Sequence, residues 1–86
     1  MSLYEVAFAP AATKELNKLP KKVVQRVLEA VADLTADPRP KGCKKIHGED
    51  NVFRIRVGDY RVIYAVFDKE VTVLIVRVRH RKDAYQ

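Results

Sequence analysis

The sequence predicts a single α+β domain in which two N-terminal helices pack on one face of a small antiparallel sheet, in the order β-α-α-β-β-β. Three observations predict this fold: a short alternating segment near the start, two apolar stripes of helical spacing after it, and three alternating segments separated by turns. The chain of 86 residues is long enough for one modest core, so residues 1–86 are expected to form one domain.

The first half of the chain contains one strand and both helices. Residues 3–8 alternate as a short strand, and Pro10 suits a first helical turn. Helical spacing then recurs up to Pro20 in Ala12, Leu16 and Leu19. The second helix begins at once, and its apolar stripe consists of Val24, Val27, Leu28, Val31 and Leu34. Two prolines in residues 37–40 end it, because proline disfavours helix at and before its position.

The second half of the chain is expected to form a loop and three strands. The loop, residues 41–51, contains two glycines and a basic group made of Lys41, Lys44, Lys45 and His47. The strands cover about residues 52–57, 60–67 and 71–79, with connections at Gly58-Asp59 and Asp68-Lys69-Glu70.

Gly58-Asp59 suits a two-residue turn, which pairs Val57 with Tyr60 and Arg56 with Arg61. Like charges opposite one another are unfavourable unless an anion lies between them. If the next connection has three residues, Arg61 lies beside Arg77, and one face carries Arg54, Arg56, Arg61, Arg77 and Arg79. A two-residue connection would turn the last strand over. The other face would pack on the helices through Phe53, Ile55, Val57, Tyr60, Val62, Tyr64, Leu74 and Val76, so neither tyrosine receives a functional role.

The positive charge lies in the second half. The net charge is +6; residues 1–38 carry five basic and five acidic side chains, whereas residues 39–86 carry twelve and six. Scattered basic residues usually form a solvated face, but arginines that alternate with apolar residues share one surface. This pattern favours RNA or DNA as the partner.

Other classes of protein are disfavoured by the composition. No apolar run is long enough to span a membrane, and the N-terminus lacks the pattern of a secretory signal. The single cysteine, Cys43, allows no internal disulfide and fits the cytoplasm. No cluster has metal-ligand spacing, since His47 and His80 are far apart among basic residues, so we expect no metal and no cofactor.

Three segments together resemble the RelE/ParE toxin superfamily of type II toxin-antitoxin modules. They are Ala12-Thr13-Lys14-Glu15-Leu16-Asn17-Lys18-Leu19-Pro20, the strand pair of residues 53–64, and His80-Arg81-Lys82-Asp83-Ala84-Tyr85. The resemblance to the RelE branch implies a ribosome-dependent endoribonuclease, an mRNA interferase that cuts mRNA in the ribosomal A site and inhibits translation. It also implies a RelB-like antitoxin as partner, with the toxin a monomer or part of a toxin-antitoxin hetero-oligomer.

The resemblance also implies site residues. The catalytic set consists of Arg54, Arg56, Arg61, His80, Arg81 and Tyr85, and the RNA-binding set of Lys44, Lys45, His47, Arg77, Arg79 and Lys82. The chemistry supports the arginines, because RNA supplies its own 2′-hydroxyl nucleophile and guanidinium forks stabilise the charge that develops on the phosphate. Arginine is a poor base, so proton transfer falls to His80, Tyr85 or a lysine, and Tyr85 could instead stack on a base.

Two other functions stay open at this stage. A ParE-like toxin poisons DNA gyrase by binding the protein, and its members generally lack the basic and aromatic C-terminal cluster of His80, Arg81 and Tyr85. The other is a non-catalytic nucleic-acid-binding module, in which the arginines only hold phosphates.

Overall fold

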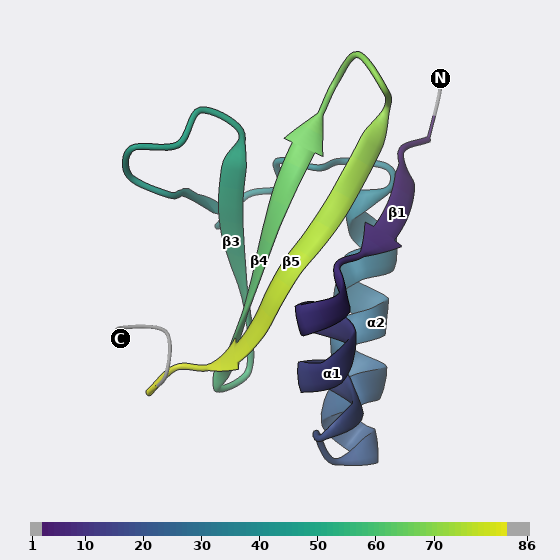
Figure 1. Cartoon of the computed structure of the whole chain (residues 1–86), viewed down its shortest axis with the longest axis vertical. Coiled ribbons are helices and arrows are strands. Elements are labelled where there is room, and N and C mark those ends of the chain that lie inside the picture. Colours follow the sequence, from purple (N-terminus) through teal and green to yellow (C-terminus); the bar gives the residue numbers. More distant parts are fainter. Residues whose placement is uncertain (1–2, 83–86) are drawn as a thin grey trace.

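The fold is a five-stranded sheet covered on one side by two helices (Figure 1). The computed structural model describes residues 3–82. The elements, in chain order, are β1 (Glu5–Phe8), α1 (Pro10–Asn17), α2 (Lys21–Leu34), β2 (Lys44–Lys45), β3 (Val52–Val57), β4 (Tyr60–Phe67) and β5 (Thr72–His80). Among the described residues, no helix is long and apolar enough to cross a membrane.

The predicted fold class is confirmed, but the sheet is not purely antiparallel and has one strand more than expected. Its strand order is β1-β5-β4-β3-β2, and the pairs from β2 to β5 are antiparallel. β1 pairs with β5 in parallel, so the sheet is mixed. The predicted loop 41–51 contains the two-residue strand β2, which extends the sheet beyond β3.

The helices begin and end where the prolines require. Pro10 occupies the first turn of α1, where its missing N–H is not needed. Pro20 precedes α2, and Pro38 and Pro40 follow it. In α2 the buried residues are Val27, Val31 and Leu34, as expected, but Leu28 is 45% exposed. Leu28 was wrongly assigned to the buried stripe, because α2 turns the side that carries Val23 and Ala30 toward the core.

The β3–β4 hairpin is confirmed residue by residue. Val57 pairs with Tyr60, and Arg56 pairs with Arg61. Gly58 has a φ of +60°, a left-handed conformation that glycine adopts without steric cost. A two-residue turn leaves no freedom in register, which is why the sequence predicted this pairing.

The β4–β5 register differs from the expected one. The connection has four residues, 68–71, and β5 begins at Thr72. Together with a one-residue shift farther along β5, this pairs Arg61 with Arg79 rather than Arg77. Arg77 pairs with Ile63, and the next pair joins Tyr64 to Ile75. Val76 is therefore the extra residue of a β-bulge, and strict alternation fails there.

The bulge decides which β5 residues reach the core. The fully buried β5 residues are Val73, Ile75 and Val78, whereas Leu74 pairs with Ala65 on the other face. The assignment of Leu74 and Val76 to the core face was therefore wrong. Downstream of the bulge the alternation resumes, so Arg77 and Arg79 do share a face with the arginines of β3 and β4, as predicted.

Tyr64 anchors the centre of the core. It is fully buried, its ring stacks on Phe53 with 5.9 Å between centroids, and its hydroxyl donates a 2.7 Å hydrogen bond to the carbonyl oxygen of Pro38. Burial raises the pKa of this hydroxyl, which keeps it neutral. Tyr64 is thus a core residue, as the sequence predicted.

Candidate nucleic-acid interface

Three of the predicted arginines meet where the β3–β4 hairpin lies beside the end of β5. The backbone N–H of Arg81 donates a 2.8 Å hydrogen bond to the carbonyl oxygen of Asp59, which joins the two segments. This junction carries a hollow of about 80 Å³, lined by Arg56, Gly58, Asp59, Tyr60, Arg61 and Arg81; we call it the arginine hollow.

The charge of the arginine hollow follows from the strand register. Arg61 stands directly opposite Arg56 on one side and Arg79 on the other. Arg61 is only 3% exposed, whereas Arg56 and Arg81 are open to solvent. Guanidinium groups stay protonated under all ordinary conditions, so this row keeps its positive charge. Its geometry suits an anion with several acceptor oxygens, such as a phosphate.

A second basic hollow continues from the first one. It has a volume of about 360 Å³ and is lined by Gly42, Lys44, Arg54 and Arg56, so Arg56 belongs to both. Strand β2 explains the position of Lys44, because it pairs with Arg54 across the sheet edge. Lys45 pairs with Phe53 instead, and with His47 it lines a separate hollow in the 45–50 loop. The structure therefore joins Lys44 to the arginines and sets Lys45 and His47 apart.

Arg77 and Arg79 are held by a carboxylate from α1. The carboxylate of Glu15 accepts hydrogen bonds from Arg77 Nε at 3.2 Å and Arg77 Nη2 at 3.0 Å, and it lies 3.8 Å from Arg79 Nε. It also accepts a 2.9 Å bond from the backbone N–H of Val78. β1 pairs with β5 only as far as Ile75, so Glu15 occupies the edge of β5 that β1 leaves open.

The titration of Glu15 reflects these contacts. Burial alone would raise the pKa of Glu15, but hydrogen bonds from Arg77 and Val78, with the charges of Arg77 and Arg79, lower it. The hydrogen bond to Glu15 in turn raises the pKa of Arg77. Arg77 thus has an internal anion, and a phosphate would have to displace that carboxylate.

His80 lies away from the arginine hollow. Its ring meets the ring of Tyr60 edge to face, with 5.2 Å between centroids. Its Nδ1 accepts a 3.3 Å hydrogen bond from the backbone N–H of Lys82, which places the proton of a neutral ring on Nε2. A ring in that tautomer offers a donor to its surroundings, which disfavours a role as general base.

Tyr60 is a candidate that the sequence interpretation missed. Assigned to the core by alternation, it is only half-buried and lines three hollows. The only signal in the sequence was its place directly after the turn, at the end of the sheet. Tyr85 and Asp83 lie outside the described residues, and Lys82 is exposed. Within residues 3–82, no three His, Cys, Asp or Glu side chains are placed to hold a metal ion.

Comparison with known proteins identifies the family. The family model described as "ParE toxin of type II toxin-antitoxin system, parDE" matches residues 6–85. Toxin RelG of Mycobacterium tuberculosis is 37% identical over 84 residues, which cover 96% of this chain and 97% of RelG. The chain therefore belongs to the RelE/ParE toxin superfamily, as a RelE-type toxin of a toxin-antitoxin module.

Other relatives agree in sequence and in fold. The mRNA interferase toxin RelE of Escherichia coli K12 is 28% identical over 86 residues, covering 95% of this chain and 90% of that protein. A chain in the crystal structure of the toxin-antitoxin complex RelBE2 from M. tuberculosis is 37% identical, with a TM-score of 0.82 and 94% of both chains covered. A chain of the archaeal RelE-RelB complex from Pyrococcus horikoshii OT3 is 32% identical, with a TM-score of 0.79 and coverage of 92% and 96%.

Proposed function

We propose that this toxin is a ribosome-dependent endoribonuclease that cleaves mRNA in the ribosomal A site by attack of the RNA 2′-hydroxyl on the neighbouring phosphate. The observation that carries this proposal is the arginine hollow, in which Arg56, Arg61 and Arg81 line one small space. An E. coli relative is named as an mRNA interferase, which supports the same reaction class.

Arg61 and Arg81 are assigned to the scissile phosphate. During the reaction the phosphate passes through a five-coordinate state with additional negative charge, and preorganised donors stabilise that charge. Arg61 is buried and fixed between two strands, whereas Arg81 lies at the end of β5 and closes the hollow. Arg56 lies at the junction of the two basic hollows, from which Arg54 and Lys44 continue the contact to adjacent phosphates.

Proton transfer is assigned to Tyr85 in preference to His80. The hydrogen bond from Lys82 engages Nδ1 of His80, and His80 does not line the arginine hollow. The hydroxyl of Tyr85 is the other group that the family resemblance supplies, and it follows Arg81 by four residues. No step of this scheme uses a metal ion, because the RNA provides the nucleophile and the guanidinium groups provide the charge.

We infer an antitoxin as the partner that controls the activity. The related structures include RelB-RelE complexes from bacteria and archaea, which supports a RelB-like protein as the partner. A cationic surface is best masked by an acidic or amphipathic segment. Co-expression with the neighbouring gene should relieve growth arrest; absence of both binding and relief would leave the partner unsupported.

A gyrase-directed activity is the second candidate, and the description of the matching family model as ParE favours it. One assay series separates the possibilities. Purified toxin is added to a translation reaction with programmed ribosomes, and in parallel to gyrase with plasmid DNA. Cuts in mRNA that need the ribosome support the proposed function, whereas gyrase-dependent DNA breaks support the alternative. If neither product forms, the remaining possibility is a non-catalytic nucleic-acid-binding role.

A further inference from the structure

A further hollow, at the same end of the sheet as the arginine hollow, is lined by aromatic side chains to which the proposed reaction assigns no role. It has a volume of about 280 Å³ and lies between α1 and the ends of β4 and β5. Its lining combines two rings, two cations, two apolar side chains and one carboxylate: Tyr60, His80, Lys18, Arg79, Leu19, Val78 and Glu15. We call it the aromatic hollow.

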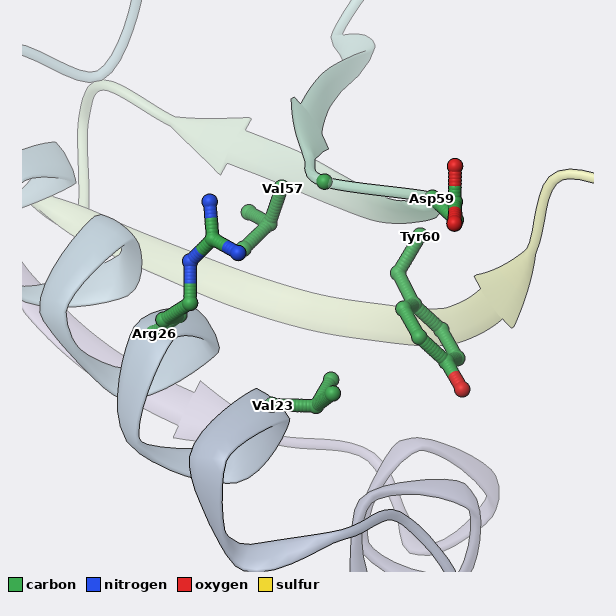
Figure 2. Close-up of a pocket in the computed structure, with 6 residues that line it drawn as sticks. Val23, Arg26, Val57, Asp59 and Tyr60 are labelled. Carbon is green, nitrogen blue, oxygen red and sulfur yellow. The ribbon is translucent and has the colours of Figure 1, made fainter.

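Tyr60 connects this hollow to the arginine hollow, because it lines both. It also lines a pocket of about 190 Å³ with Val23 and Arg26 of α2, seen in Figure 2. Figure 2 shows the Tyr60 ring extending from the hairpin toward the helices, with its hydroxyl directed away from Val57. Tyr60 is therefore common to three hollows at this end of the sheet.

His80 supplies the second ring in a fixed orientation. Its Nδ1 is held by the Lys82 backbone N–H, and within residues 3–82 its Nε2 makes no hydrogen bond. In the edge-to-face contact with Tyr60, the edge of one ring meets one face of the other, so this contact leaves the other ring faces unused. An aromatic surface and a ring N–H thus remain for a planar polar group.

The cations of the aromatic hollow connect it to the phosphate site. Lys18 is exposed at the end of α1. Arg79 lines the hollow and is also the cross-strand partner of Arg61. Paired residues on antiparallel strands lie about 5 Å apart. A nucleotide whose phosphate contacts Arg61 can therefore reach the aromatic hollow with its neighbouring base.

We propose that the aromatic hollow binds one base of single-stranded RNA beside the cleaved phosphate, with Tyr60 and His80 as the stacking surface and Lys18 and Arg79 contacting the backbone. This inference rests on the proposed function, since it takes RNA as the substrate. A nucleotide fits better than a peptide side chain, because its base has a π-face for the rings and its phosphate can contact the cations. The carboxylate of Glu15 is already engaged by Arg77, Arg79 and Val78.

The test uses a short single-stranded RNA in which each position in turn carries 2-aminopurine, a base whose fluorescence falls on stacking. Wild-type toxin should quench one position strongly. Tyr60→Leu should remove the quench and weaken binding about tenfold, the scale of one lost base stack. Tyr60→Phe keeps the ring and should behave as the wild type. The matched control is Phe67→Leu, which removes a partly exposed ring at the other end of β4.

A second measurement needs no substitution, in case Tyr60→Leu does not fold. RNA with 4-thiouridine is photocrosslinked to wild-type toxin, and the crosslinked peptides are mapped by mass spectrometry. Crosslinks at Tyr60 or His80 support the subsite. Crosslinks confined to the 41–51 loop, or no RNA binding, overturn it.

The outcomes distinguish a failure of the proposed base subsite from a failure of the proposed function. If Tyr60→Leu leaves the quench unchanged while Arg61→Ala abolishes RNA cleavage, the subsite is wrong and the nuclease assignment stands. If Tyr60→Leu weakens only antitoxin binding, the hollow docks a protein and the RNA subsite is likewise wrong. If ribosome-dependent cleavage is absent in the wild type, the proposed function itself fails.

Discussion

Arginines at the end of the sheet fall into two groups with different surroundings. Arg77 and Arg79 on β5 share the Glu15 carboxylate. For Arg54, Arg56 and Arg81, no carboxylate within residues 3–82 lies within 4.0 Å of the guanidinium. The first group carries its own counter-ion, whereas the second has none within the described part of the chain. We therefore expect the arginines of the second group, rather than Arg77, to bind the cleaved phosphate.

Another arginine, far from the site, also has an internal carboxylate as its partner. Arg39 forms a 2.7 Å ion pair with Asp68, which also accepts a 2.7 Å hydrogen bond from the Tyr4 hydroxyl. The Arg39 hydrogen bond lowers the pKa of Asp68, with a further contribution from Tyr4. This pair joins the turn after β4 to the segment after α2, so its role is structural. Exposed pairs of this kind contribute little stability, about 0–1 kcal/mol.

The largest effect is expected from Arg61, the buried arginine of the arginine hollow. Arg61→Ala should lower ribosome-dependent mRNA cleavage at least about tenfold, because one charged transition-state contact is worth upwards of about 1.4 kcal/mol. Arg61→Lys should recover only part, since lysine lacks the guanidinium fork. Lys69→Ala, the same charge change in the distant β4–β5 turn, is the control. A folded Arg61→Ala variant with normal cleavage would show that Arg61 serves the fold alone.

The next effect concerns the two proton-transfer candidates. Tyr85→Phe keeps the aromatic ring and removes only the hydroxyl. It should lower the cleavage rate markedly, because the group assigned to proton transfer is then missing. His80→Gln should weaken RNA binding but preserve the shape of the pH–rate profile, since His80 lies outside the arginine hollow. Measuring kcat and KM across pH distinguishes the two. Loss of a pH-dependent limb in His80→Gln would restore the histidine as the base.

A smaller effect is expected when the first group of arginines loses its carboxylate. Glu15→Gln should lower the free energy of unfolding by about 1 kcal/mol at neutral pH, a modest value because the ion pair is partly exposed to solvent. The pKa of Glu15 is lowered in the folded state, so its contribution is present above the ordinary value of 4.5 and is lost as pH falls through the folded pKa. Denaturation curves of the two proteins should converge in acid. Glu29→Gln, at an exposed position of α2, is the control. If both variants lowered the free energy of unfolding equally at neutral pH, the contacts of Glu15 with Arg77 and Val78 would not stabilise the fold.

The smallest effect lies at the other end of the sheet. Val71 has a φ of +51°, a left-handed conformation that strains a β-branched residue. Val71→Asn should raise the free energy of unfolding by up to about 1 kcal/mol without changing cleavage, since asparagine tolerates this conformation. Lys69→Asn in the same turn should have no effect. Lower stability in Val71→Asn would mean that its apolar contacts outweigh the strain.

Particular residues show which parts of the structure could be predicted from the sequence. Gly58-Asp59 fixed the hairpin, and the prolines fixed the helix ends, because both act through local backbone geometry. The bulge at Val76 and the parallel pairing of β1 depend on contacts distant in sequence, which alternation does not reveal. The site residues share this limit. The pairing of Arg56 with Arg61 could be predicted from the turn. The contacts of Glu15 with Arg77 and the partial exposure of Tyr60 depend on the tertiary fold and could not.

The two groups of arginines are compared most directly by one pair of variants. Ribosome-dependent cleavage of a defined mRNA is measured for Arg81→Ala and Arg77→Ala, which remove the same side chain from positions four residues apart. We expect at least about a tenfold loss for Arg81→Ala and near-normal cleavage for Arg77→Ala, once the folding of both variants is verified. Equal losses in both variants, or normal cleavage by Arg81→Ala, would contradict the claim that Arg81 holds the cleaved phosphate and that Arg77, which is paired with Glu15, does not.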